Sequence, residues 1–464
     1  MAPTDHKMLN RRDLLRISGM GFGSLALHAM LTGEAHSERL GGPLQSRPPR
    51  FTARAKHVIF LFMPGGPSQV DTYDPKPRLI RDNGKISPKL YLGKQRNLLA
   101  SPWKFSKHGS SGIDVSSLFP HTATCVDDLC IIRSMIADDV NHPGACLQMN
   151  TGERVFSRPS MGSWITYGLG TENQNLPGFI AIGPGPIIEG ARQFGSSFLP
   201  AAFQGTFVSD MDQPIQNLNN SSLSIFQRRQ ELGLLNQLNQ LHRDQRETDS
   251  RLNARMESFE LAFRMQMRAP EAFDLSRESR LTHRMYGVDN PTTSVFARQC
   301  ILARRLVERG VRFVQLYDTT DGFQPWDQHS DLKGGHEKNA ARTDQPIAAL
   351  LKDLRASGLL EETLVIWGGE FGRTPTSQGT DGREHHPHGY SLCLAGAGVR
   401  PGFIHGATDD FGWYAAEKKM HIHDFHATLL HLMGIDHEKL TFRYSGRDFR
   451  LTDVHGEIAH EIIS

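Results

Sequence analysis

The feature that most constrains this fold is a series of short, continuous apolar runs, each closed by polar or turn-forming residues. The first run covers 58–63, and a Pro-Gly-Gly-Pro turn at 64–67 ends it. Further runs cover 130–135, 311–316 and 363–367. A short apolar run without polar alternation is typical of a strand buried on both faces, as in a parallel sheet.

Helical patterns alternate with these runs. Segments 300–307 and 347–354 have helical spacing and end near Gly310 and Gly358, directly before a strand. A further helix is expected at 425–430, with Asp424 as its N-cap. This alternation predicts an α/β fold with a doubly wound, mostly parallel sheet and helices on both faces.

One segment departs from this alternation. Leu234, Leu238 and Leu241 recur at helical spacing without an intervening strand. We therefore expect a helical insertion in the main domain over about 223–285. Whether it serves as a lid, an interface or plain packing is left open by the sequence.

The N-terminus has the layout of an export signal. Arg11 and Arg12 precede a short, glycine-rich apolar stretch at 17–31. The paired arginines predict export by the twin-arginine translocase to the periplasm or the exterior, and an ordinary basic start to a domain is the alternative. The stretch is too short for a transmembrane helix of about 20 apolar residues, and no other segment is apolar enough to span a bilayer. The predicted division is a signal peptide at 1–37, a linker at 38–55 and the α/β domain at 56–464.

Composition and net charge limit the classes of partner and site that are expected. The 464 residues carry a formal net charge of only +2, so a nucleic-acid partner, which needs a clustered basic excess, is not expected. The five cysteines are scattered without CxxC spacing, which indicates buried thiols rather than disulfides or a thiolate zinc site. The 22 histidines, in contrast, are numerous enough to suggest metal binding.

Carboxylates and imidazoles follow the predicted strands, where open α/β sheets place their sites. The candidate metal ligands are Asp71, Asp327, His329, Glu370, His385, His386 and His388. Such a set suits a divalent metal, Zn, Mn or Fe, better than calcium, which takes more carboxylates. The group around His385 is the most specific, and a solvated surface loop is its alternative.

Three other residues are candidate catalytic groups. His142 stands at the start of a helix expected at 145–149, where the dipole favours a neutral imidazole suited to a metal ligand or general base. A capping or packing role is its alternative. Arg373 could neutralise an anionic substrate oxygen, or it could pair with Glu370. Ser68 is a reserve nucleophile to which the sequence assigns no base.

Several motifs carry a family resemblance. They are Gly65-Gly66-Pro67-Ser68 with Asp71-Thr72, Ala303-Arg304-Arg305-Leu306-Val307-Glu308, Trp326-Asp327-Gln328-His329, Glu370-Phe371-Gly372-Arg373-Thr374-Pro375 and His385-His386-Pro387. With them the whole chain, signal included, resembles the exported bacterial proteins grouped as the domain of unknown function 1501 family. That family resembles the alkaline phosphatase and sulfatase superfamily, and Asn141-His142-Pro143 through Thr151-Gly152 is similar to the sulfatase nucleophile helix. The resemblance implies the doubly wound fold and a metal-assisted hydrolytic site for phosphate or sulfate esters.

The chain departs from the superfamily pattern at the reacting groups. His142 stands at or beside the position of the sulfatase Cys or Ser that becomes formylglycine, and Phe371 replaces a metal-binding histidine. The paired aspartates after the first strand are absent as well. We therefore expect a metal-activated water to attack an anionic ester or a sulfated glycan. The alternative is a non-catalytic envelope or glycan-binding protein that kept the fold.

Overall fold

The computed structural model of the chain describes residues 43–211, 230, 234, 237 and 271–464. Within them, Leu44–Ser464 form one compact unit. The predicted signal at 1–37 and most of the predicted insertion at 223–285 lie outside the described residues, so both stay predictions. The described C-terminal end of the insertion contains a 3₁₀ turn, η4 (Leu275–Arg277), and helix α8 (Arg280–Tyr286).

A nine-stranded sheet organises this unit, in the order β12-β4-β11-β8-β1-β7-β5-β6 with β15 beside β4. Its strands are β1 (His57–Phe62), β4 (Leu129–Ile136), β5 (Phe179–Ile182), β6 (Thr206–Val208), β7 (Phe313–Tyr317), β8 (Thr363–Gly368), β11 (Tyr390–Ala395), β12 (Phe403–His405) and β15 (Met420–His421). Strand β11 is antiparallel to both of its neighbours, β8 and β4, and the other pairs are parallel. The predicted α/β class with a mostly parallel sheet is confirmed.

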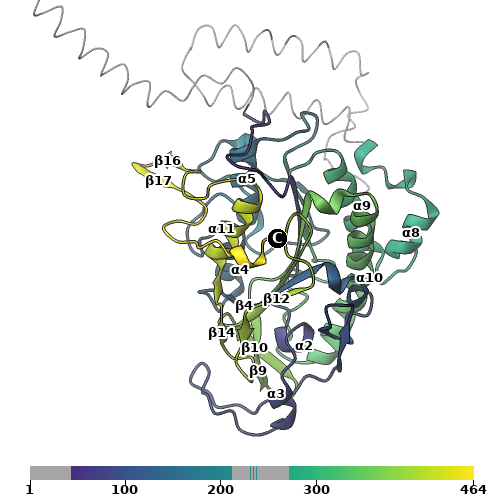
Figure 1. Cartoon of the computed structure of the whole chain (residues 1–464), viewed down its shortest axis with the longest axis vertical. Coiled ribbons are helices and arrows are strands. Elements are labelled where there is room, and N and C mark those ends of the chain that lie inside the picture. The colour runs from purple at the N-terminus through teal and green to yellow at the C-terminus, as the bar shows by residue number, and fades with distance from the viewer. Residues whose placement is uncertain (1–42, 212–229, 231–233, 235–236, 238–270) are drawn as a thin grey trace, which may run out of the picture. The chain divides into compact units, whose positions relative to one another are not determined.

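Helices cover both faces of the sheet because side chains alternate along each strand. Ile59 and Leu61 of β1 belong to a core shared with α9 and α10, whereas Val58, Phe60 and Phe62 pack with α4, α5 and α11. Figure 1 shows these two groups of helices on opposite sides of the sheet. The helices are α2 (Gln69–Thr72), α3 (Pro77–Arg81), α4 (His142–Thr151), α5 (Met161–Leu169), α9 (Ser294–Glu308), α10 (Leu332–Ala356) and α11 (Ile422–Leu432).

Four two-stranded ribbons complete the described structure. They are β2 (Phe105–His108) with β3 (Ile113–Ser116), β9 (Gly372–Gln378) with β10 (Gly382–His386), β13 (Ala407–Thr408) with β14 (Ala415–Glu417), and β16 (Phe442–Tyr444) with β17 (Arg447–Phe449). The β9–β10 ribbon matters most for the site, because it links the end of β8 to the start of β11.

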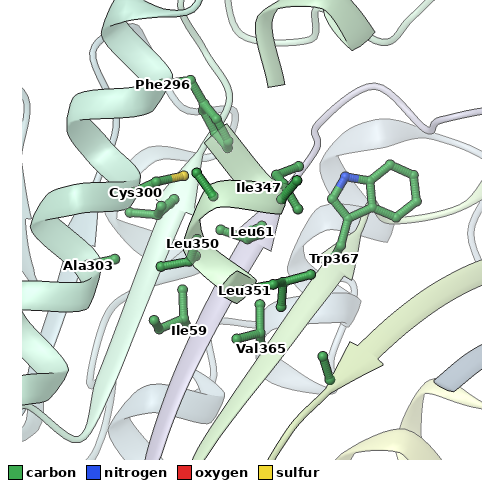
Figure 2. Close-up of a cluster of buried hydrophobic side chains, with 14 of the residues drawn as sticks. Ile59, Leu61, Phe296, Cys300, Ala303, Ile347, Leu350, Leu351, Val365 and Trp367 are labelled. Atoms are coloured by element: carbon green, nitrogen blue, oxygen red, sulfur yellow. The ribbon is translucent and has the colours of Figure 1, made fainter. Parts of the chain in front are cut away.

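One core holds the centre of the sheet against α9 and α10 (Figure 2). Leu61 of β1 and Val365 of β8 meet Cys300 of α9 and Leu350 of α10 there, all nearly or fully buried. Burying one large aliphatic side chain contributes about 1.5–3 kcal/mol. The loops at the carboxyl ends of β1, β7 and β8 therefore begin at strands that this core holds in place.

The predicted strands agree with the observed ones to within two residues, but two details of the predicted helices are wrong. The helix expected at 347–354 is only the end of α10, which continues through Pro346. Asp424 is not the N-cap of α11. His421 caps that helix, and Asp424, at its third position, accepts a 2.9 Å hydrogen bond from the backbone N–H of His421.

The described part of the predicted linker is bonded to the domain. Backbone N–H groups of Arg47, Arg50 and Arg54 donate to the carbonyls of Leu169, Gly434 and Leu432 at 2.8–2.9 Å. All five cysteines are buried and free, as predicted. Among the residues that the structure describes, no helix is both long and apolar enough to cross a membrane.

Candidate metal centre

Loops at the carboxyl ends of the strands bring the candidate ligands to one place. Asp327 and His329 lie between β7 and α10, and His142 is the first residue of α4, after β4. Glu370 follows β8, and His385 comes from β10. In an open α/β sheet, this edge is where binding sites form.

One carboxylate oxygen is the focus of the cluster. Asp327 Oδ1 lies 3.3 Å from His142 Nε2, 3.1 Å from His329 Nε2 and 3.2 Å from His385 Nε2. His329 Nε2 and His385 Nε2 lie 2.8 Å from each other. Each imidazole therefore presents the same ring atom, Nε2, to the same point.

The opposite nitrogen of each ring is held by an oxygen. His142 Nδ1 lies 2.5 Å from Glu370 Oε1, and His385 Nδ1 lies 2.7 Å from the carbonyl oxygen of Val140. His329 Nδ1 bonds to Gln378 Oε1. Because these oxygens accept hydrogen bonds, each Nδ1 carries a proton, and the neutral form of each ring has an Nε2 lone pair that faces Asp327.

Lone pairs directed at a carboxylate oxygen repel it unless a cation lies between them. One extra proton would relieve one of these contacts and leave the others. His142 Nε2 is also a buried polar atom without a hydrogen-bond partner among the described residues. Imidazoles whose Nδ1–H is tied to an oxygen are the usual form of histidine metal ligands. The donor set of three imidazoles and one carboxylate thus fits a divalent metal.

Geometry alone also selects these residues as possible ligands. His142, Asp327 and His385 place their ligand atoms within 4.8 Å of one another, and so do His329, Glu384 and His385. The second set adds Glu384, a residue absent from the sequence-based candidates. Its only signal in the sequence is its place next to His385.

The turn after β1 holds Glu370, the carboxylate that positions His142. The backbone N–H of Gly65 donates to Glu370 Oε1 at 2.9 Å, and Glu370 in turn holds His142. Gly65 has φ of 110°, and a Cβ there would lie 2.6 Å from the backbone nitrogen of Asp327. Only glycine combines this left-handed backbone with so close an approach.

Arg373 supports Asp327 and does not face an open site. Its Nη2 pairs with Asp327 Oδ1 at 2.6 Å, and its side chain is fully buried. The other donors are directed at carbonyl oxygens, including Gly66 at 3.0 Å and Arg383 at 3.1 Å. The geometry therefore makes Arg373 a positioning residue, and its partner is Asp327 rather than the expected Glu370.

The family match covers nearly all of the predicted α/β domain. The model of the family described as protein of unknown function, DUF1501, matches residues 55–463. The chain belongs to this family. No curated protein matches its sequence.

Solved structures resemble the DUF1501 chain in fold. The PsFucS1 sulfatase from Pseudoalteromonas sp. is 13% identical, with 83% of this chain and 68% of that chain covered and a TM-score of 0.37. The SpPMH phosphonate monoester hydrolase from Silicibacter pomeroyi is 10% identical, with 82% and 73% covered and a TM-score of 0.36. A protein in the alkaline phosphatase superfamily from Vibrio parahaemolyticus is 10% identical, with 85% and 70% covered and a TM-score of 0.35. At these identities, the likeness concerns the fold alone.

The charge state of His142 in the DUF1501 protein differs from the expected one. Burial lowers the pKa of its imidazole, but the carboxylates of Asp327 and Glu370 beside the ring outweigh burial and raise the pKa above the usual value. Burial likewise raises the pKa of Asp327, yet the three imidazoles and Arg373 lower it overall. Without metal, the site therefore favours an extra proton on His142, in contrast to the neutral ring that the helix dipole predicts.

Two predicted site residues lie in a separate buried group. Asp71 pairs with Arg383 at 2.6 Å, and the Ser68 hydroxyl donates to Asp71 at 2.5 Å. His336 Nε2 accepts the backbone N–H of Ser68 at 3.2 Å. The Ser68, Asp71 and Arg383 side chains are fully buried. The structure thus gives Asp71 an arginine partner in place of a metal, and it encloses the Ser68 hydroxyl.

The other two predicted histidine ligands point elsewhere. His386 follows His385 on β10, where successive side chains face opposite sides, and His388 lies beyond the end of that strand. His386 is buried between Tyr91 and Trp413, and its Nε2 bonds to the carbonyl of Trp413. Burial lowers the pKa of His386 to about 3. His388 is exposed and stacks on Tyr414 at 5.8 Å.

This separation predicts different effects for two histidines of one short segment. His388→Ala should leave the metal content of the purified protein unchanged, because the ring packs on Tyr414 and His386, away from Asp327. His385→Ala should lower it, because it removes an Nε2 donor that faces Asp327. Elemental analysis of both variants, each checked for folding by circular dichroism, measures the difference. Equal metal loss in the two would contradict the assignment.

Proposed function

We propose that this protein is an exported, metal-dependent hydrolase of phosphate or sulfate esters, including those of sulfated glycans. The observation that carries the proposal is the convergence of three Nε2 atoms on one oxygen of Asp327. Export by the twin-arginine translocase to the periplasm or the exterior is part of the proposal, and the paired arginines of the N-terminus support it.

His142, His329, His385 and Asp327 would hold the divalent metal, with Zn, Mn or Fe as the ions that suit these donors. Such an ion supplies Lewis acidity, which polarises an ester oxygen and lowers the pKa of water. Glu370 and Val140 fix the rings of His142 and His385 through their Nδ1–H groups. His329 is the most exposed of the three rings, so we place the substrate's approach on its side of the cluster.

Water is the proposed nucleophile. Ser68 is enclosed and its hydroxyl donates to Asp71. Cys146 is buried one turn into α4, and burial, with the charge of Glu370 nearby, raises the pKa of its thiol well above the usual value. Neither side chain is available for a covalent intermediate.

The same enclosure supports a second candidate function. A chain that keeps metal-type residues but no accessible nucleophile could bind sulfated or phosphorylated glycans at the cell envelope without turning them over. Metal binding is common to both candidates, and only hydrolysis separates them.

Elemental analysis of the purified protein tests the metal, beside a double variant with Asp327→Ala and His385→Ala. We expect stoichiometric Zn, Mn or Fe in the wild type and little in the double variant. The metal-loaded protein should then release nitrophenol from p-nitrophenyl phosphate or sulfate. A folded wild type that takes up none of these ions would refute the hydrolase, and metal uptake without turnover of any ester would favour the binding protein.

A further inference from the structure

A polar cavity away from the Asp327 cluster lies beside the start of α11. Its volume is about 670 Å³, which falls in the range of cavities that bind small molecules. Three imidazoles line it, those of His421, His423 and His455. Asp138, from the loop between β4 and α4, closes one side through a 3.1 Å contact with His421 Nε2.

The most buried histidine of this cavity is His423. Only 6% of the residue is exposed, and its Nδ1 lies 3.0 Å from the carbonyl oxygen of Thr452. Since a carbonyl only accepts, Nδ1 carries the proton and Nε2 is left with a lone pair. That Nε2 has no hydrogen-bond partner within the described part of the chain, although the side chain lines the cavity. Burial also lowers the pKa of His423, which keeps the ring neutral.

Carboxylates supply most of the remaining lining. Asp138, Asp424, Glu438 and Glu457 face a single arginine, Arg450. Both oxygens of Asp424 accept backbone N–H groups, from His421 at 2.9 Å and Glu457 at 2.8 Å. The Glu438 carboxylate is 3.7 Å from Arg450, and that of Glu457 pairs with no cation among the described residues.

A cavity rich in acceptors and negative charge requires a ligand rich in donors and positive charge. A metal ion is one such ligand, but the two groups of described side chains whose ligand atoms lie within 4.8 Å of one another are both at the Asp327 cluster. The cavity's acceptors are spread over a larger volume. We propose that it binds a small organic amine, whose ammonium group donates to His423 Nε2 and to the carboxylates of Glu438 and Glu457.

The chemistry of the ammonium group matches these acceptors. It carries three N–H donors and a full positive charge, and it needs several acceptors around it when it leaves water. An amino sugar or a short polyamine is of a size that this volume admits. This assignment rests on the cavity alone and holds whether or not the Asp327 cluster is catalytic.

The test is isothermal titration calorimetry of the folded protein with D-glucosamine and N-acetyl-D-glucosamine. The two differ at the nitrogen, which loses its charge on acetylation. We expect glucosamine to bind about tenfold or more tightly than its acetylated form. The double variant Glu438→Gln, Glu457→Gln should bind glucosamine more weakly by about the same factor. Glutamine keeps the shape of the glutamate side chain, so the variant removes two negative charges without reshaping the cavity.

Glu308→Gln is the matched control, since Glu308 is about half exposed on α9, on the other side of the sheet. It should bind glucosamine as the wild type does. Equal affinity for the two sugars would overturn the proposal, as would failure of both glucosamine and spermidine to bind. Displacement of bound glucosamine by one equivalent of Zn²⁺ in the Asp327→Asn background would also overturn it, in favour of a metal site.

Discussion

Asp327→Asn is expected to cost the protein its bound metal. The substitution keeps the size of the side chain but removes the negative charge on which three imidazoles and Arg373 converge. Loss of an outer partner of a metal ligand already costs about 10–100-fold in affinity. Loss of this central ligand should therefore weaken metal binding by at least about 100-fold, and hydrolysis should fall with it. Competition with a chelator of known affinity measures the first effect.

Asp289→Asn is the control for this variant. Asp289 is exposed between α8 and α9 and pairs with no cation among the described residues. It should leave both metal affinity and turnover unchanged. If Asp327→Asn kept wild-type metal affinity, the convergence of the imidazoles on this residue would have no role in metal binding, and the proposed centre would be wrong.

Arg373→Met is expected to destabilise the fold itself. Removing one partner of a buried ion pair typically costs about 3–5 kcal/mol, because the remaining charge is left uncompensated. Here the remaining charge is Asp327, and the carbonyls of Gly66 and Arg383 also lose their donors. The urea midpoint should fall accordingly, with little change in the dependence on urea. Added Zn²⁺ should recover part of the loss by binding the folded state.

The exposed Arg81 provides the comparison, since 71% of its side chain is accessible. Arg81→Met should change the free energy of unfolding by no more than about 0.5 kcal/mol. If Arg373 instead contacted the substrate, Arg373→Met would unfold like the wild type and lose only turnover. The unfolding curve thus separates the positioning role from the catalytic role that the sequence suggests.

The strands could be predicted from sequence because both faces of this sheet are covered. β1, β7 and β8 are continuous apolar runs, and turn residues mark their ends. Whether a strand runs parallel or antiparallel to its neighbours could not be predicted in this way. The six residues of β11 are equally buried, and nothing in their spacing distinguishes an antiparallel strand from a parallel one. Most of α10 was missed in the prediction, which began the helix directly after Pro346. A proline inside a helical pattern usually marks a helix end, but α10 continues through it.

Part of the site could be predicted as well, since strand ends in the sequence are neighbours in space. Asp327, His329, Glu370 and His385 were expected together, and the structure brings them together. Adjacency along the chain was the less reliable guide. It grouped His386 with His385, although strand alternation sends the two rings apart. No pattern in the sequence could reveal that Arg383 forms an ion pair with Asp71, because the two residues lie 312 positions apart in the chain.

The antiparallel β11 has a further consequence. Because it runs back alongside β8, the β9–β10 ribbon leaves and re-enters the sheet between two neighbouring strands. The ribbon carries His385 and Arg373 opposite each other and spans only residues 372–386. It is thus a short module whose removal would leave the order of the sheet intact. A homologue could replace this ribbon with a tight loop, keep the sheet and lose His385 of the proposed metal centre in a single deletion.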